Sequence, residues 1–361
     1  MPLLNKIPVY KSFRQFNRPR LLPLNYTISL TYRCNSRCKT CNIWQKKSDE
    51  LTLEEYKKIF AGFGTSPYWI TISGGEPFLK KDIAEIIQCL YKTCHPKIIN
   101  IPTNGILTEL IVEKIKIILS SCPKTKFVIN LSLDEIGERH DDIRNIKGNF
   151  NKTINTFNCL KGLNYPNLTL GIHTVVSKFN VQRLPEIAAE LLKLNPDSYI
   201  TEIAEKRIEL DTINSDITPS AEEYAAAIDN LIGILKKYPA SGLGKVTQKL
   251  RFSYYNLVKR ILKENRQILP CFAGFASCHI APDGDVWMCC IKAEPIGNLR
   301  ETNYDFKKIW FSEKAYKVRD YIKKGECFCP LASASYTNML FNIKTISRIA
   351  LSSFFKLLSR E

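Results

Sequence analysis

The sequence predicts an α/β protein built around a partial, six-unit TIM-like barrel. Six short apolar runs with strand-like alternation recur between residues 25 and 205, and helical patterns lie between them. Strands that alternate with helices form parallel βαβ units, because a parallel pair of strands needs a long crossover connection. Six units complete less of a circle than the eight of a full barrel, so we expect an open barrel.

The order of the elements follows from their periodicity. Strands are runs in which apolar residues alternate with polar ones or form short continuous stretches, and they cover residues 26–31, 68–73, 97–101, 126–134, 168–176 and 198–205. Helices are predicted from about residue 52, where Thr52 precedes two glutamates as a capping residue does, and over 82–91, 109–119, 153–161 and 184–194.

The two ends of the chain differ from the barrel in composition. Residues 1–24 are rich in Pro and Arg and are predicted to be an irregular basic extension, with the core domain at 25–245 and a Cys-rich domain at 246–330. In the tail, 331–361, apolar residues recur at steps of three and four, which predicts an amphipathic helix over about 338–358. That helix either lies in a membrane interface or caps the barrel, and its Lys and Arg residues argue against a membrane span.

Charge and cysteine content restrict the class of protein. The formal net charge is +17, and residues 1–48 contain ten Lys or Arg and no Asp or Glu. This excess suits an anionic partner, including an anionic membrane surface, although charge says little about specific function. Thirteen cysteines without a secretory signal indicate metal ligation in a reducing compartment, so we expect a cytoplasmic protein with peripheral membrane association as one option.

Three cysteines directly after the first strand form the most specific motif. Cys34, Cys38 and Cys41 have the spacing C-x3-C-x2-C. Three thiolates cannot close a four-coordinate structural zinc site, whereas a four-iron cluster held by three Cys keeps one iron open for another ligand. A zinc knuckle or a set of structural thiols is the alternative if the cysteines are taken alone.

A second motif, Gly74-Gly75-Glu76-Pro77, ends the next predicted strand. The glycines allow close approach of backbone to a ligand, and Glu76 offers an acceptor for an ammonium group. Together the two motifs resemble those of the radical S-adenosylmethionine (radical SAM) enzymes. The resemblance implies a catalytic 4Fe-4S cluster on the three Cys, S-adenosylmethionine (SAM) held partly by residues 74–77, and an electron donor such as ferredoxin or flavodoxin.

Four further residues lie where later strands of the barrel end. The resemblance implies that Asn104, Ser132, Asp134 and Arg144 surround the nucleoside and carboxylate of SAM. Each also has an ordinary structural explanation: a turn at Asn104, a helix cap at Ser132 or Asp134, and a surface ion pair at Arg144. His173, inside an apolar strand, is expected to be a core histidine.

A second group of cysteines follows the barrel. Asp283-Gly284 between two short apolar runs predicts a hairpin that returns its last Cys towards the first. The group resembles the SPASM and twitch domains, which hold auxiliary iron-sulfur clusters. The resemblance implies one auxiliary cluster, bound by Cys271, Cys278 and Cys289 with one of Cys327 or Cys329. A zinc-stabilised hairpin is the alternative.

The sequence therefore predicts a radical SAM enzyme that cleaves SAM reductively and abstracts hydrogen from a bound substrate. From the basic ends of the chain we expect a membrane-associated or lipid-linked precursor as substrate, with maturation of a ribosomally made peptide as the rival. An alternative of another class is a non-catalytic, zinc-bearing nucleic-acid-binding protein. No RNA-binding signature with aromatic residues on a basic strand supports it, so no specific nucleic acid is expected as a partner.

Overall fold

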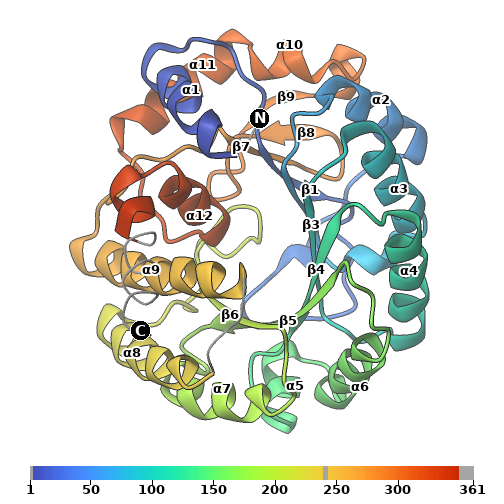
Figure 1. The fold of residues 1–361 in the computed structure, drawn as a ribbon, viewed down its shortest axis with the longest axis vertical. Coiled ribbons are helices and arrows are strands. Elements are labelled where there is room, and N and C mark those ends of the chain that lie inside the picture. The colour runs from blue at the N-terminus through green and yellow to red at the C-terminus, as the bar shows by residue number, and fades with distance from the viewer. Residues whose placement is uncertain (1–2, 239–242, 349–361) are drawn as a thin grey trace, which may run out of the picture.

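The structure, a computed structural model, describes residues 3–238 and 243–348. Its strands form one curved sheet, with helices packed on the outside (Figure 1). Six parallel strands make the barrel wall: β1 (Asn25–Ser29), β2 (Trp69–Ser73), β3 (Ile98–Thr103), β4 (Lys126–Ser132), β5 (Leu168–Val176) and β6 (Ser198–Ile203). The predicted open six-unit barrel is confirmed.

The helices between these strands lie close to their predicted positions. They are α2 (Leu53–Phe63), α3 (Ile83–Cys94), α4 (Thr108–Ser121), α6 (Asn149–Lys161) and α7 (Leu184–Leu192). Thr52 caps α2 as predicted, since its side chain accepts from the Glu55 amide while the Glu55 carboxylate accepts from the Thr52 amide. Helices α5 (Glu138–Arg144), α8 (Ala221–Lys236) and α9 (Leu243–Glu264) were not predicted.

The Cys-rich domain continues the barrel sheet. Its strand β7 (Ser277–Ile280) pairs with β1 in parallel, and β8 (Asp285–Trp287) and β9 (Pro295–Asn298) follow as antiparallel neighbours. The predicted hairpin joins β7 to β8, with Gly284 at a φ of +92° that favours glycine. Two helices, α10 (Phe306–Trp310) and α11 (Glu313–Lys324), complete this part.

The two faces of the barrel sheet differ sharply. Apolar residues at alternate positions, such as Ile72, Ile101 and Ile129, are fully buried and join the apolar faces of the helices in one core. Side chains on a strand alternate between faces, and the helices cover the outer face, so the residues in between point into the barrel. Polar members of that inner set are Thr27, Ser29, Thr71, Ser73, Asn100, Asn130, Ser132, His173 and Glu202, with apolar residues such as Val128, Val175 and Ile200 between them.

The N-terminal region differs from the expected irregular extension. It forms a helix, α1 (Leu3–Phe16), which contains Pro8 and buries Tyr10 and Phe13 in the main core. The prediction of irregular structure here was wrong, because these buried aromatic contacts outweigh the helix-breaking tendency of a single proline.

The tail packs on the barrel as far as it is described. Helix α12 (Ala332–Leu340) ends before Asn342, whose side chain accepts from the Thr345 amide. The prediction of one continuous helix from residue 338 was therefore wrong. Met339 and Phe341 are buried, and the Phe341 ring stacks on Phe272 with a centroid distance of 4.5 Å. Residues 349–361 of the predicted helix lie outside the described residues. No helix in residues 3–238 and 243–348 is long and apolar enough to span a membrane.

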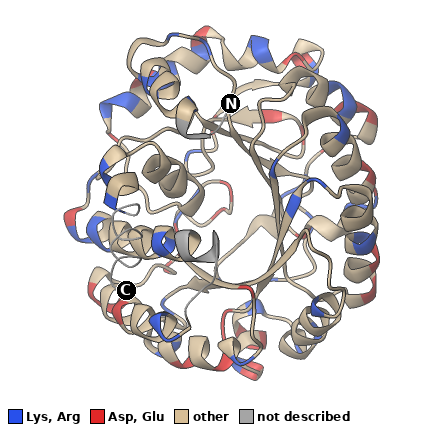
Figure 2. Ribbon diagram, in the orientation of Figure 1, with Lys and Arg blue, Asp and Glu red and all other residues tan. Residues whose placement is uncertain are grey.

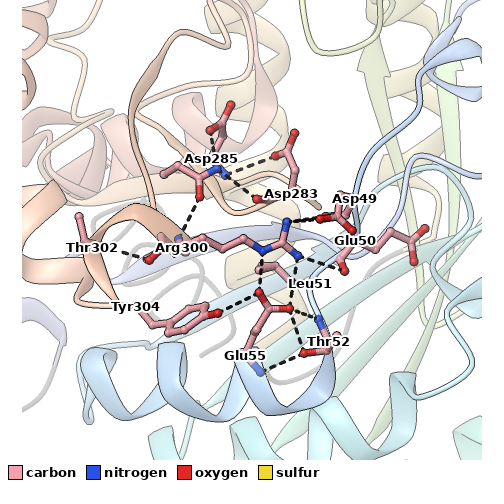
Figure 3. Close-up of polar contacts among 12 residues, drawn as sticks. Asp49, Glu50, Leu51, Thr52, Glu55, Asp283, Asp285, Arg300, Thr302 and Tyr304 are labelled. Atoms are coloured by element: carbon pink, nitrogen blue, oxygen red, sulfur yellow. Dashed lines mark hydrogen bonds and ion pairs between the residues drawn. The ribbon is translucent and has the colours of Figure 1, made fainter.

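Arg300 ties the Cys-rich domain to the barrel (Figure 3). Its guanidinium donates to Glu55 Oε1 at 2.6 Å and to Asp49 Oδ2 at 2.8 Å. The Tyr304 hydroxyl donates to the same Glu55 oxygen at 3.1 Å. Arg300 holds the pKa of Glu55 down at about 2, so this carboxylate stays ionised and bound at neutral pH.

Replacing Arg300 with Gln should therefore weaken the contact between the two parts. Loss of charged hydrogen bonds to Glu55 and Asp49 should lower the free energy of unfolding by about 2 kcal/mol, seen as a fall in Tm of about 3 °C. Arg266→Gln is the control, because its ion pair with Glu264 is largely exposed and should contribute little. Equal melting temperatures for the two variants would contradict the assignment.

Candidate active site at the barrel rim

The three cysteines of the first motif lie together in the loop that follows β1. The Cys41 amide donates to the Cys38 carbonyl at 3.1 Å, and the Arg37 amide anchors the loop on the Arg144 carbonyl at 3.1 Å. Burial raises the pKa of Cys34 to about 11 and that of Cys41 to about 12, and charge on a neighbouring thiol of the group adds to each shift. Three half-buried, unpaired thiols at one point fit the proposed cluster, since a bound metal ion would stabilise them as thiolates.

The glycines of the second motif dock β2 against this loop. The Gly75 amide donates to the Thr31 carbonyl at 2.7 Å, and the Glu76 amide donates to the Arg33 carbonyl at 2.9 Å. A Cβ atom at Gly75 would overlap the Arg33 carbonyl, and Gly74 has a φ of +131°. The two glycines were expected to let the backbone approach a ligand. In the structure they let the end of β2 approach the backbone of the cysteine loop.

Glu76 and Pro77 continue this junction towards β3. The Glu76 carboxylate is buried and accepts from Thr103 Oγ1 at 2.9 Å and from the Asn104 amide at 2.8 Å. Burial raises its pKa to about 7, against these hydrogen bonds, which lower it. Pro77 begins a short 3-10 turn. That Glu76 also receives the ammonium of SAM stays a prediction.

Asn104 and Arg144 reach the cysteine loop directly. Asn104 Nδ2 donates to Asn35 Oδ1 at 2.7 Å and lies 3.9 Å from Cys34 Sγ. A nitrogen of the Arg144 guanidinium lies 3.7 Å from Cys38 Sγ, so a positive charge stands beside this thiol. Both residues thus contact the cysteine loop, and their expected contact with SAM stays a prediction.

Asp134 orients Arg144. Its Oδ2 lies 2.7 Å from Arg144 Nε, and its Oδ1 accepts from the Val175 amide at 2.9 Å. Burial opposes ionisation of Asp134, yet the charge of Arg144 and these hydrogen bonds hold its pKa below the usual value. The pair is therefore a buried ion pair and not the surface pair considered from sequence.

His173 lies on the inner face of the barrel and is not the core histidine expected from sequence. It stands opposite Ser132 in the register of β4 and β5. Its Nε2 has no hydrogen-bond partner and lies 3.8 Å from Glu202 Oε1 of β6. The alternation of side chains along a strand could have placed His173 and Glu202 on the inner face from sequence, because it puts them on the same face as Ser132.

Four cysteines gather at the second centre. Burial is the main reason that the pKa of Cys271 rises to about 11, and charge on Cys289 or Cys327 raises it further. Burial likewise raises the pKa of Cys329, with contributions from Cys271 and Cys289. These four thiols, Cys271, Cys289, Cys327 and Cys329, supply the donor set that a four-iron auxiliary cluster requires.

Cys278 points away from that group. It lies on β7 beside β1, and the strand alternation that turns its neighbour His279 into the barrel turns Cys278 outwards. There it is buried in the core near Tyr26 and the buried Arg319 guanidinium. The structure therefore favours both Cys327 and Cys329 as ligands in place of Cys278.

Iron content can test this choice. Cys289→Ser should remove the auxiliary cluster and lower iron by about four atoms per chain, whereas Cys278→Ser should keep the wild-type iron content. Iron and sulfide analysis after anaerobic reconstitution measures both. Loss of iron in the Cys278 variant alone would restore the assignment made from sequence.

Gly75→Ala should displace the cysteine loop. Its Cβ can be accommodated only if the backbone at Arg33 moves, and a shift of this kind near a reacting centre costs about a hundredfold in rate. The measurement is the amount of 5'-deoxyadenosine formed from SAM with dithionite. The variant in which Cys34, Cys38 and Cys41 are all replaced by Ala gives the background level. Gly233→Ala, where an added Cβ meets open space, is the matched control. Unchanged formation in Gly75→Ala would refute the docking role.

Comparison with known proteins gives matches over both cysteine groups. Residues 28–191 match the model of the radical SAM superfamily, and residues 271–330 match that of an iron-sulfur cluster-binding domain, SPASM. The mycofactocin maturase MftC of Mycolicibacterium smegmatis is 26% identical over 329 residues, covering 89% of this chain and 78% of MftC. A probable GTP 3',8-cyclase of Methanocaldococcus jannaschii is 30% identical over 228 residues, covering 60% of this chain and 72% of the cyclase.

A solved structure shares the fold. Streptococcus suis SuiB bound to SAM superposes with a TM-score of 0.63 at 15% identity, covering 88% of this chain and 72% of SuiB. The family matches coincide with the two centres that the geometry forms, one at the end of β1 and one beyond β7. The chain belongs to the radical SAM superfamily and carries a C-terminal SPASM domain.

Proposed function

We propose that this radical SAM enzyme modifies a peptide that enters the open side of its barrel. The single observation that carries the proposal is the polar inner face of the sheet, lined by hydroxyl, amide, imidazole and carboxylate groups at successive strands. Such groups can pair with the many donors and acceptors of a peptide backbone. The acyl chain of a lipid would leave them without partners at a cost in free energy, so the lipid-linked substrate expected from charge is less well supported.

Relatives add support for a peptide. MftC is named a maturase, and SuiB, which shares the fold, has also been solved with its precursor peptide SuiA. The non-catalytic, zinc-bearing alternative is set aside because the chain belongs to an enzyme superfamily.

The chemistry of the cofactors sets what the protein has to do. SAM and the catalytic cluster, when bound, supply a 5'-deoxyadenosyl radical that abstracts hydrogen from the substrate. Residues of this chain hold the geometry: the glycine junction fixes the cysteine loop, and the Asp134 and Arg144 pair keeps a positive charge next to Cys38. His173, half-buried with a free Nε2 beside Glu202, is placed to accept a proton from a substrate in the barrel.

The electron donor is proposed to be a small acidic protein such as ferredoxin or flavodoxin. The net charge of +17 favours an anionic partner of this kind, and Figure 2 shows Lys and Arg spread over the outer helices. An anionic membrane would exploit the same charge, so association with one stays a prediction.

A direct experiment tests candidate precursor peptides, chosen among short reading frames in the neighbourhood of the gene for this chain. Anaerobically reconstituted enzyme, SAM and dithionite should change the mass of the peptide and form 5'-deoxyadenosine in step with it, as mass spectrometry and chromatography would show. A scrambled peptide of the same composition is the control.

His173→Gln and Thr169→Val separate a role for the inner face from general damage. The first removes the proton acceptor and should slow peptide modification more than cleavage of SAM, whereas the second alters a half-buried residue of the same strand farther from the rim. If lipid extract, and no peptide, raises the yield of 5'-deoxyadenosine, the peptide proposal fails.

A further inference from the structure

A buried group of three side chains lies between the two cysteine centres and belongs to neither. One ligand atom each from Glu209, His279 and Cys290 lies within 4.8 Å of the other two. All three residues are at least nine-tenths buried. We propose that they form a zinc site, separate from the catalytic and auxiliary clusters.

Three chain segments hold the group in place. His279 is on β7, Cys290 follows β8, and Glu209 is in the loop after β6. The Glu209 amide donates to the Cys290 carbonyl at 3.3 Å, and the Ile208 amide donates to the Ile291 carbonyl at 3.1 Å, so the loop is fixed against the cysteine segment by its backbone. The ligand atoms are therefore brought together by the fold and not by a flexible loop tip.

The imidazole is oriented from both sides. The Trp287 ring packs on the His279 ring with a centroid distance of 4.8 Å, and His279 Nε2 lies 2.9 Å from Ser29 Oγ and 3.7 Å from Glu209 Oε1. The Trp287 ring fixes the plane of the imidazole, and zinc would replace the Ser29 hydrogen bond at Nε2, the ring nitrogen that faces Glu209.

The donor types select zinc. One thiolate, one imidazole and one carboxylate suit a cation of intermediate softness, and three protein ligands leave a fourth position open. A bound zinc ion would balance the charges of the Glu209 carboxylate and the Cys290 thiolate. The guanidinium of Arg207, now 3.6 Å from both Glu209 Oε2 and Cys290 Sγ, would then be free to pair with Glu205, whose Oε1 has no hydrogen-bond partner.

The open position would face the inside of the barrel. His279 shares the inner face with Ser29, as their hydrogen bond shows, and the loop that carries Glu209 also touches the catalytic loop, where the Asn42 amide donates to the Leu210 carbonyl at 2.9 Å. A carboxylate or thiolate of a substrate in the barrel is the class of ligand that such a zinc ion would take. The zinc site itself does not depend on which substrate the enzyme uses.

The test measures zinc and iron on the same samples. Anaerobically reconstituted holoenzyme is incubated with zinc sulfate, desalted and analysed by mass spectrometry of the metals, with about one zinc per chain expected beyond the iron of the clusters. His279→Gln, Cys290→Ser and the isosteric Glu209→Gln should each lose that zinc, while His279→Gln and Glu209→Gln keep the wild-type iron. His95→Gln and Cys159→Ser, at exposed positions, are the matched controls and should bind zinc as the wild type does.

Zinc K-edge absorption then identifies the ligands. One sulfur together with nitrogen and oxygen scatterers supports the site, whereas four sulfurs would mean that zinc has replaced iron in the auxiliary centre and would overturn it. The proposal also fails if wild-type holoenzyme binds no zinc, or if Cys290→Ser loses iron and keeps zinc, since Cys290 would then be a cluster ligand. Glu209→Gln, which preserves side-chain shape, keeps the test decisive where a larger change disturbs folding.

Discussion

The parallel pairing of β1 with β7 is the contact on which the arrangement of both centres depends. β1 leads into the catalytic cysteine loop, and β7 follows Cys271 and leads through β8 to Cys289. Because Thr27 stands opposite His279 in this register, the strand alternation also decides which side chains face the barrel. A shift of one residue would turn Cys278 inwards and His279 into the apolar core.

Close backbone packing fixes the position of the catalytic cysteine loop, as the pairing of β1 with β7 fixes the Cys-rich domain against the barrel. Gly74 and Gly75 let the end of β2 lie against the carbonyl groups of Thr31 and Arg33, and any side chain there would collide with them. Glu76 then links the same junction to the end of β3. The loop that holds three thiols is thus braced by the ends of two neighbouring strands.

Buried arginines are paired with carboxylates at the catalytic loop and at the group of Glu209, His279 and Cys290. Arg144 is held by Asp134 beside Cys38, and Arg207 lies between Glu209 and Cys290. Each guanidinium stands next to a thiol and a carboxylate, so its charge has a buried partner of opposite charge. An isolated charge would be costly in these interiors, so the partners are needed together.

The sequence by itself determined the barrel, the capped helix at Thr52, the cysteine motif, the need for close backbone approach at Gly74 and Gly75, and the hairpin at Asp283, because each depends on residues close together in the chain. The tertiary structure decided which segments far apart in the chain come into contact. It turned Cys278 into the core, placed His173 inside the barrel, and folded residues 3–16 into a helix on buried aromatic contacts. It also joined Glu209 to His279 and Cys290, from three segments that no local pattern connects. Burial and strand register depend on the whole fold, and these were the properties that local periodicity left open.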